Sequence, residues 1–180
     1  MPSTAAATHV MPPAIITHST VALRGQQRGL DITVHHARTP DARIGITFNG
    51  LQMAIYSCHA AQGLLAASTA ARGQMIHLPR QIPSPPTDPH ETDARVVLSV
   101  EWTRRPVYSV VAQSAVNKLK TGRVNWLDLY TGPITWQIRD QAALLSMIEL
   151  LTRAHKTATA IFADGEQYDA DPTSPDYHAA

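Results

Sequence analysis

The chain repeats one pattern of strands, turn and helix. Residues 46–56 and 128–138 each contain two strand-like runs, joined by turns that contain Gly50 and Gly132. A helix-like segment with a Leu-Leu pair follows each block, AAQGLLAASTAAR after the first and QAALLSMIELLTRA after the second. Two further strand-like runs precede each block. A duplication of this kind constrains the fold because each unit must bury an apolar face against its neighbour.

The pattern predicts an α+β fold, built as a duplicated ββββα repeat with two antiparallel four-stranded sheets, each backed by one helix. In the first half, Ile44, Ile46 and Phe48 alternate with polar or small residues, which is the period of a half-buried strand. The Asn-Gly pair at 49–50 is a strong hairpin signal. The predicted divisions are a flexible arm over 1–18, a first repeat over 19–78, a Pro-rich linker over 79–94, a second repeat over 95–163 and an acidic, disordered tail over 164–180.

Capping residues locate the two helices. Ser57 is the expected N-cap of the first helix, and Gly73 is expected near its C-terminal end. Asp140 is the expected N-cap of the second helix, over 141–155, whose apolar residues follow the helical i, i+3, i+4, i+7 spacing. Trp102 and Trp136 fall on the apolar faces of their strands and are expected in the core.

The register of the two halves is ambiguous in the sequence. Aligning the turn glycines places Ile44 and Ile46 opposite Trp126 and Asp128, which breaks the apolar pattern. A shift by one residue places the same pair opposite Asn125 and Leu127. Because a one-residue slip moves every side chain to the other face, either one hairpin carries a bulge or the resemblance between the halves is only architectural.

Composition limits the compartment and the classes of partner. The 180 residues include one cysteine, so an intrachain disulfide is impossible. We see no signal peptide and no apolar run of membrane-spanning length, and we expect a cytoplasmic protein without a membrane partner. The segment 164–180 has five acidic residues and no Lys or Arg, whereas the rest of the chain holds all 15 basic residues. A basic body with an acidic tail is a recurring layout in nucleic-acid-binding proteins.

Four strands and a helix, repeated across a Pro-rich link, resemble the whirly and PUR-repeat proteins over residues 20–156. The second half carries the closest match, an aromatic strand, an Asn, a basic Gly-Arg turn and a hairpin that leads into a helix. The matching residues are Tyr108, Asn117, Gly122, Arg123, Trp126, Leu127, Ile138, Arg139 and Asp140. The resemblance implies that the sheets bind single-stranded DNA or RNA.

Single-strand binding requires cations along the backbone and aromatic faces for stacking, and the second half offers both. If Leu127 and Leu129 face the core, Trp126 and Tyr130 share the opposite face as a stacking platform. Alternatively, these aromatic residues pack under a neighbouring strand or in an oligomer interface, where aromatic residues are enriched. The candidate nucleic-acid-binding residues are Arg104, Arg105, Tyr108, Lys118, Lys120, Arg123, Trp126 and Tyr130. A weaker set in the first half consists of Arg24, Arg28, Arg38, Arg43 and Tyr56, of which Arg43 and Tyr56 are the preferred members.

No catalytic motif competes with this interpretation. The sequence lacks GxSxG, P-loop and GxGxxG motifs, and neither His35-His36 nor Cys58-His59 has the spacing of a zinc site. We therefore expect no enzyme activity, no cofactor and no metal. The expected function is binding of single-stranded nucleic acid, with the protein as a homo-oligomer. The alternative is a structural or assembly protein, such as a virion component, that acts through protein–protein contacts.

Overall fold

The computed structural model describes residues 16–27, 31–48, 51–83 and 97–178. The fold is α+β and consists of two four-stranded sheets and two long helices, as the sequence predicts. In chain order the elements are β1 (Ser19–Leu23), β2 (Asp31–His35), β3 (Arg43–Phe48), β4 (Leu51–Ile55), α1 (Cys58–Arg72), the 3₁₀ turn η1 (Met75–His77), β5 (Leu98–Trp102), β6 (Tyr108–Val116), β7 (Arg123–Thr131), β8 (Ile134–Ile138) and α2 (Gln141–Ile161).

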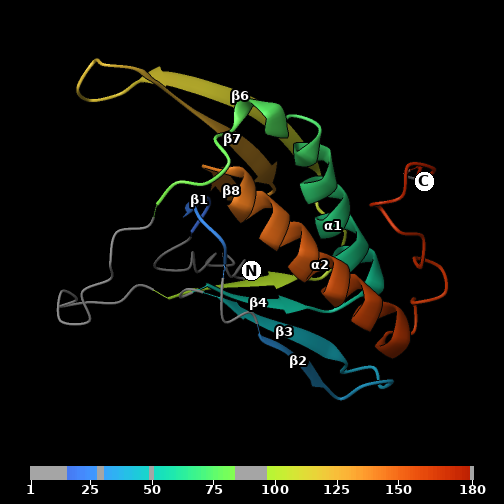
Figure 1. The fold of residues 1–180 in the computed structure, drawn as a ribbon. Helices are drawn as coiled ribbons and strands as arrows, with labels where there is room; N and C mark the ends of the chain where they lie inside the picture. The colour runs from blue at the N-terminus through green and yellow to red at the C-terminus, as the bar shows by residue number, and fades with distance from the viewer. Residues whose placement is uncertain (1–15, 28–30, 49–50, 84–96, 179–180) are drawn as a thin grey trace, which may run out of the picture.

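The two repeats exchange their first strands. Sheet A has the order β1-β8-β7-β6, and sheet B has the order β2-β3-β4-β5. Each sheet is therefore antiparallel except where the exchanged strand is added, because β1 pairs with β8 and β5 pairs with β4 in parallel. Figure 1 shows the two sheets on either side of the paired helices. The exchange makes the halves interdependent, since neither repeat completes a sheet alone.

Strand pairing resolves the register of the duplication. Ile44 pairs with Ile55 in sheet B, and Leu127 pairs with Ile138 in sheet A, so the equivalent positions differ by 83 residues. Aligning the turn glycines gives the wrong offset between the halves, because the two glycines are not equivalent. Gly50 is the second residue between its strands, whereas Gly132 is the first and adopts φ +63°. With this offset, the buried Ile44 and Ile46 correspond to the buried Leu127 and Leu129. Neither a bulge nor a purely architectural resemblance is needed.

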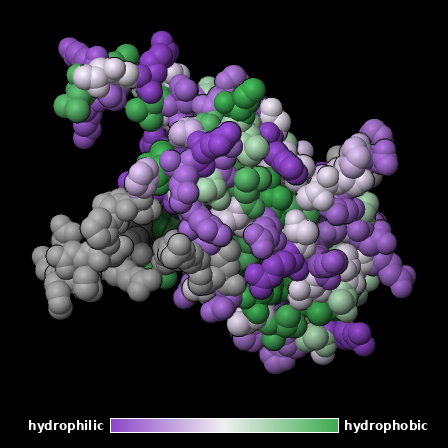
Figure 2. Space-filling view, viewed as in Figure 1, coloured by the Kyte–Doolittle hydropathy of each residue, from purple (hydrophilic) through white to green (hydrophobic). Residues whose placement is uncertain are grey.

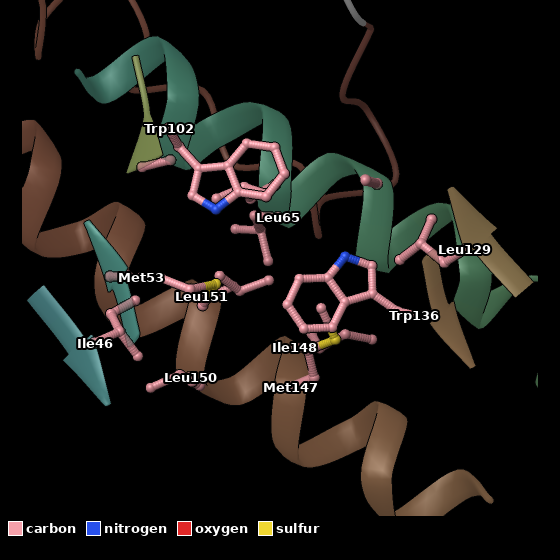
Figure 3. Packing of buried hydrophobic residues seen from close by; sticks show 14 of the residues in the cluster. Ile46, Met53, Leu65, Trp102, Leu129, Trp136, Met147, Ile148, Leu150 and Leu151 are labelled. Carbon is pink, nitrogen blue, oxygen red and sulfur yellow. The ribbon is translucent and has the colours of Figure 1, made fainter. Parts of the chain in front are cut away.

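The core lies between the sheets and the helix layer. Both Trp102 and Trp136 are buried, as expected from the alternation in their strands. Figure 3 shows Trp102 beside Leu65 of α1, and Leu151 of α2 near Met53 of sheet B. The two helices pack against each other, and α1 also contacts β6 and β7, which belong to the other repeat. Neither helix in the described part of the chain is long and apolar enough to cross a bilayer.

The N-caps form as predicted. Ser57 accepts a hydrogen bond from Ala60 N, and Asp140 accepts one from Ala143 N. Asp140 is fully buried and also accepts from the backbone N–H groups of Gly25 and Ile82, at 2.7 and 2.8 Å. This carboxylate thus joins the end of β1, the start of the Pro-rich segment and the first turn of α2.

The second helix is longer than predicted, and the tail is not free. Helix α2 continues past 155 to Ile161, because Ala158 and Ile161 extend its buried stripe. Composition predicts disorder over 164–180, but the structure places residues 164–178 along α1. The Asp164 carboxylate accepts hydrogen bonds from Cys58 N and His59 N, at 2.9 and 3.1 Å. The first turn of a helix has unpaired N–H groups and a positive dipole end, which together favour a carboxylate there.

Further contacts hold the tail in place. The rings of Tyr168 and His59 are stacked with centroids 4.3 Å apart. The Tyr168 carbonyl oxygen accepts a hydrogen bond from Gln62 Nε2 and lies 2.7 Å from Nε2 of His155. Residues 1–15 of the predicted arm and 84–94 of the predicted linker lie outside the described residues.

Candidate nucleic-acid interface

The outer face of sheet A, turned away from the helices, carries the two aromatic residues that the sequence indicated. Leu127 and Leu129 are buried in the core, so Trp126 and Tyr130 alternate with them onto the outer face, where both remain partly exposed. Strand register brings Gln113 beside Trp126 and Ser109 beside Tyr130 on β6. The predicted arrangement of Trp126 and Tyr130 on one face is therefore present.

Polar contacts hold Trp126 from two sides. Its indole Nε1 donates a hydrogen bond to Asp128 Oδ1 at 3.1 Å, and Asp128 is itself buried on the same face. The Arg139 guanidinium carbon lies 4.9 Å from the centre of the indole ring. Arg139 also donates to Gln137 Oε1 at 3.0 Å. These contacts give the aromatic ring a defined orientation beside a cation.

A shallow hollow of about 390 Å³ continues from this cluster across the exchanged strand. Arg24, at the end of β1, and Arg139 contribute two guanidinium groups to it, and Ala22, Ile82 and Val124 complete the lining. The parallel pairing of Leu23 with Ile138 brings these two arginines to the same end of the sheet. Two guanidinium groups beside an aromatic ring match the chemistry of a phosphate next to a stacked base.

The sequence named Arg139 only as part of the resemblance and Arg24 only in the weaker set of the first half, so neither was expected beside Trp126. Arg139 follows Thr135 and Gln137 at a period of two, opposite to the buried Ile134, Trp136 and Ile138. This alternation was sufficient to place Arg139 on the outer face. The position of Arg24 beside Arg139 could not have been found in this way, because only the strand exchange brings β1 beside β8.

The hairpin of β6 and β7 projects beyond the body and carries the predicted lysines (Figure 1). Lys118 and Lys120 are exposed at its tip, where the Asn117 side chain bonds to the backbone and hydroxyl of Thr121. Arg123 shares the face of Leu127, opposite to Trp126, and donates from Nε to Ser114 Oγ. Figure 2 shows hydrophilic and hydrophobic side chains next to each other on this projection.

Three other candidates lie away from the aromatic pair. Arg105 is directed along α1, where it donates from one nitrogen to Gln62 Oε1 and Tyr177 Oη. Tyr108 is on the core side of β6 and packs against the buried cluster. Arg104 is exposed in the turn between β5 and β6. The structure therefore places Arg105 beside Gln62 and Tyr177, and Tyr108 on the core side of β6, so neither joins Trp126 and Tyr130 on the outer face.

In the weaker set, Arg43 and Tyr56 lie on the outer face of sheet B, and Arg28 is outside the described residues. Arg43 begins β3, and Tyr56 follows β4 and donates to Glu101 Oε1 at 3.2 Å. The 83-residue offset makes Arg43 equivalent to Trp126 and Tyr56 equivalent to Arg139. The two sheets therefore carry a cation and an aromatic residue at the same pair of positions, in reversed order.

The chemistry of Cys58 and the histidines does not suggest a reaction. Cys58 is buried, and desolvation together with the charges of Asp164 and Asp169 raises its thiol pKa to about 12. A thiol of such high pKa is a poor nucleophile at neutral pH. Within the described ranges, no three His, Cys, Asp or Glu side chains are grouped so as to hold a metal ion.

Comparisons with protein-family models, with curated proteins and with solved structures gave no match for this chain.

Proposed function

We propose that this protein binds single-stranded nucleic acid on the outer face of sheet A, as the resemblance to whirly and PUR-repeat proteins implies. The observation that carries the proposal is the contact of Trp126 with Arg139, with Arg24 across the exchanged strand and Tyr130 farther along the same sheet face. Bases stack on the aromatic rings, and the two arginines and the hairpin lysines contact phosphates. Asp128 is already occupied by the indole N–H, which reduces its repulsion of phosphates.

The affinity expected from this arrangement is moderate. Stacking of one base on an aromatic side chain contributes about 1–3 kcal/mol. Each neutralised phosphate adds a salt-dependent term through release of counterions. Because the recognition groups are ring faces and cations, binding depends little on base identity. Duplex DNA conceals its base faces, so the proposal requires a preference for single strands.

The test is a fluorescence-anisotropy titration with a labelled single strand of about 30 nucleotides, long enough for several binding sites of the size typical for sheet-face binders. A matched duplex and two salt concentrations are included. We expect salt-sensitive binding that favours the single strand. Absence of binding at micromolar protein and low salt would falsify the proposal.

Two pairs of variants locate the interface. Trp126→Ala removes an aromatic ring from the outer face, whereas Leu145→Ala removes an exposed apolar side chain from α2. Arg139→Gln removes a charge beside the ring, whereas Arg153→Gln removes an exposed charge from α2. Only the first member of each pair should weaken binding. Equal effects within both pairs would show that binding does not occur on this face.

The edge strand β6 favours a second candidate, assembly through protein–protein contacts. This strand has nine residues without a charge, proline or glycine, and it forms the outer edge of sheet A. Proteins usually protect such edges with charges, bulges or short strands. The edges of sheet B, in contrast, carry Asp31 on β2 and Glu101 on β5. An uncharged edge is suited to antiparallel pairing with β6 of a second copy.

Light scattering tests this second candidate. Val111→Lys places a charge on β6 where the side chain is 42% exposed. The same substitution at Leu145 of α2, also about half exposed, is the matched control. If copies pair along β6, only Val111→Lys reduces the mass of the particle. A monomeric wild-type protein would exclude assembly of this kind.

A further inference from the structure

The outer face of sheet B contains a hollow of about 320 Å³. Its floor is formed by Gly45 of β3 and Ala54 of β4, which are cross-strand partners at the centre of the sheet. Polar side chains surround this floor on the same outer face. They are His35, Arg43, Thr47, Gln52, Tyr56, Ser99 and Glu101. A volume near 300 Å³ lies at the lower end of the range for small-molecule sites.

Comparison with sheet A explains why the hollow exists. The positions equivalent to Gly45 and Ala54 are Asp128 and Gln137, whose side chains cover the floor of sheet A. At Gly45 a β-carbon would lie 2.6 Å from Thr33 Oγ1, so the neighbouring strand leaves no space for a side chain there. The floor of sheet B is therefore low, because it carries only the Ala54 methyl group and, over Gly45, the edge of the Thr33 side chain. A flat ring can be placed on this low floor.

The basic and the neutral side chains lie at opposite ends of the floor. At one end, Arg43 and His35 are cross-strand partners and present a guanidinium beside an imidazole. At the other end, Thr47 and Gln52 are partners and offer neutral donors and acceptors. Glu101 is on β5, two strands away from Arg43, which corresponds to about 10 Å between strand axes. An anionic group is thus favoured only at the end that carries Arg43.

We propose that this hollow binds one nucleotide, with its phosphate at Arg43 and His35 and its base on the floor of Gly45 and Ala54. The base edge then meets the amide of Gln52, which can pair with donors and acceptors on a base. Tyr56 flanks the ring, and its hydroxyl is directed to Glu101. The choice of a nucleotide rests on the proposed function, whereas the hollow and its charge pattern do not.

The experiment is an NMR titration of ¹⁵N-labelled protein with each of the four nucleoside monophosphates. Adenosine and inorganic phosphate, used separately, test the base and the anion alone. We expect shifts of the Gly45 and Ala54 amides with a monophosphate. Either fragment alone should bind at least about tenfold more weakly, since one charge-assisted hydrogen bond contributes about 1.5 kcal/mol or more.

Two variants and one control make the proposal falsifiable. Ala54→Leu fills the floor from the outer face, and Arg43→Gln removes the cation from an exposed position. Ala70→Leu makes the same change as Ala54→Leu at an exposed position of α1, away from both outer sheet faces. We expect only the first two to weaken monophosphate binding. Wild-type affinity in Ala54→Leu, or shifts confined to the Trp126 face, would overturn the inference.

The results of these experiments distinguish a failure of the nucleotide site from a failure of the proposed function. If monophosphates do not bind but a long single strand binds through Trp126, the hollow has no such role and the proposed function stands. If monophosphates bind at Gly45 and Ala54 but Trp126→Ala leaves strand binding unchanged, the hollow is supported and the interface on sheet A is refuted.

Discussion

Arg139 lies over Trp126, with its guanidinium carbon 4.9 Å from the centre of the indole ring. The two residues belong to one outer sheet face, although Arg139 comes from the end of β8 and Trp126 from the middle of β7. The contact leaves the Trp126 ring partly exposed and fixes a cation beside it. The effects of this contact on binding, and of the hydrogen bonds that stabilise the fold around it, can be measured.

Binding of a single strand should quench tryptophan emission through Trp126 alone. Trp102 and Trp136 are buried, so a stacked base can reach only Trp126 among the three. In Trp126→Phe we expect the quenching to disappear while binding persists, because phenylalanine retains a ring face. In Trp126→Ala we expect a loss of about 1–3 kcal/mol, or about 5- to 150-fold in affinity. Quenching that persists in Trp126→Phe would contradict this account.

The hairpin lysines should set part of the salt dependence. Each phosphate contact contributes about 0.7 to the slope of log affinity against log salt for a single strand. We therefore expect Lys118→Gln with Lys120→Gln to lower the slope by about 0.7 to 1.4. Lys156→Gln, at an exposed position of α2, is the control and should leave the slope unchanged. An unchanged slope in the double variant would place the lysines outside the interface.

Asp140 should contribute more to stability than the equivalent cap Ser57. The Asp140 carboxylate accepts three backbone hydrogen bonds, whereas the Ser57 hydroxyl accepts one from its own helix. Asp140→Ala should cost at least about 3 kcal/mol in the free energy of unfolding, because each bond to a charged group contributes about 1.5–3 kcal/mol. Ser57→Ala should cost about 1 kcal/mol. Urea denaturation measures both, and equal costs would show that Gly25 and Ile82 gain little from Asp140.

Cys58 should resist modification in the folded protein. Burial and the charges of Asp164 and Asp169 raise its thiol pKa from 9.0 to about 12, so the folded state retains the proton. Consequently, the contribution of Cys58 to stability is complete below pH 9 and declines as the pH rises towards 12. A thiol reagent at pH 8 should react slowly with the native protein and rapidly with the unfolded chain. Rapid reaction of native protein would indicate that the tail leaves α1.

Removal of residues 164–180 should lower stability and increase the reactivity of Cys58. The deletion removes Asp164 from the first turn of α1 and uncovers the thiol. The tail contacts the two helices (Figure 1), whereas Trp126 lies on the outer face of sheet A. We therefore expect the affinity for single strands to stay within a factor of about two, well below the effect of one lost phosphate contact. A large increase in affinity would support shielding by the tail instead.

The sequence alone was sufficient to predict the elements that depend on near neighbours. Alternation along β3 and β7 predicted their buried faces, and Ser57 and Asp140 predicted the starts of both helices. The same alternation placed Trp126 and Tyr130 on one outer face. These features follow from residues within a few positions of each other, so a local pattern carries the necessary information.

Only the tertiary structure decided which segments meet. The exchange of β1 and β5 brings Arg24 beside Arg139, and the return of the tail brings Asp164 to Cys58. Arg105 contacts Gln62 of α1 for the same reason. Each of these contacts joins residues more than 40 positions apart. Their choice depends on the total burial and hydrogen bonding of the completed fold, which no local pattern of residues encodes.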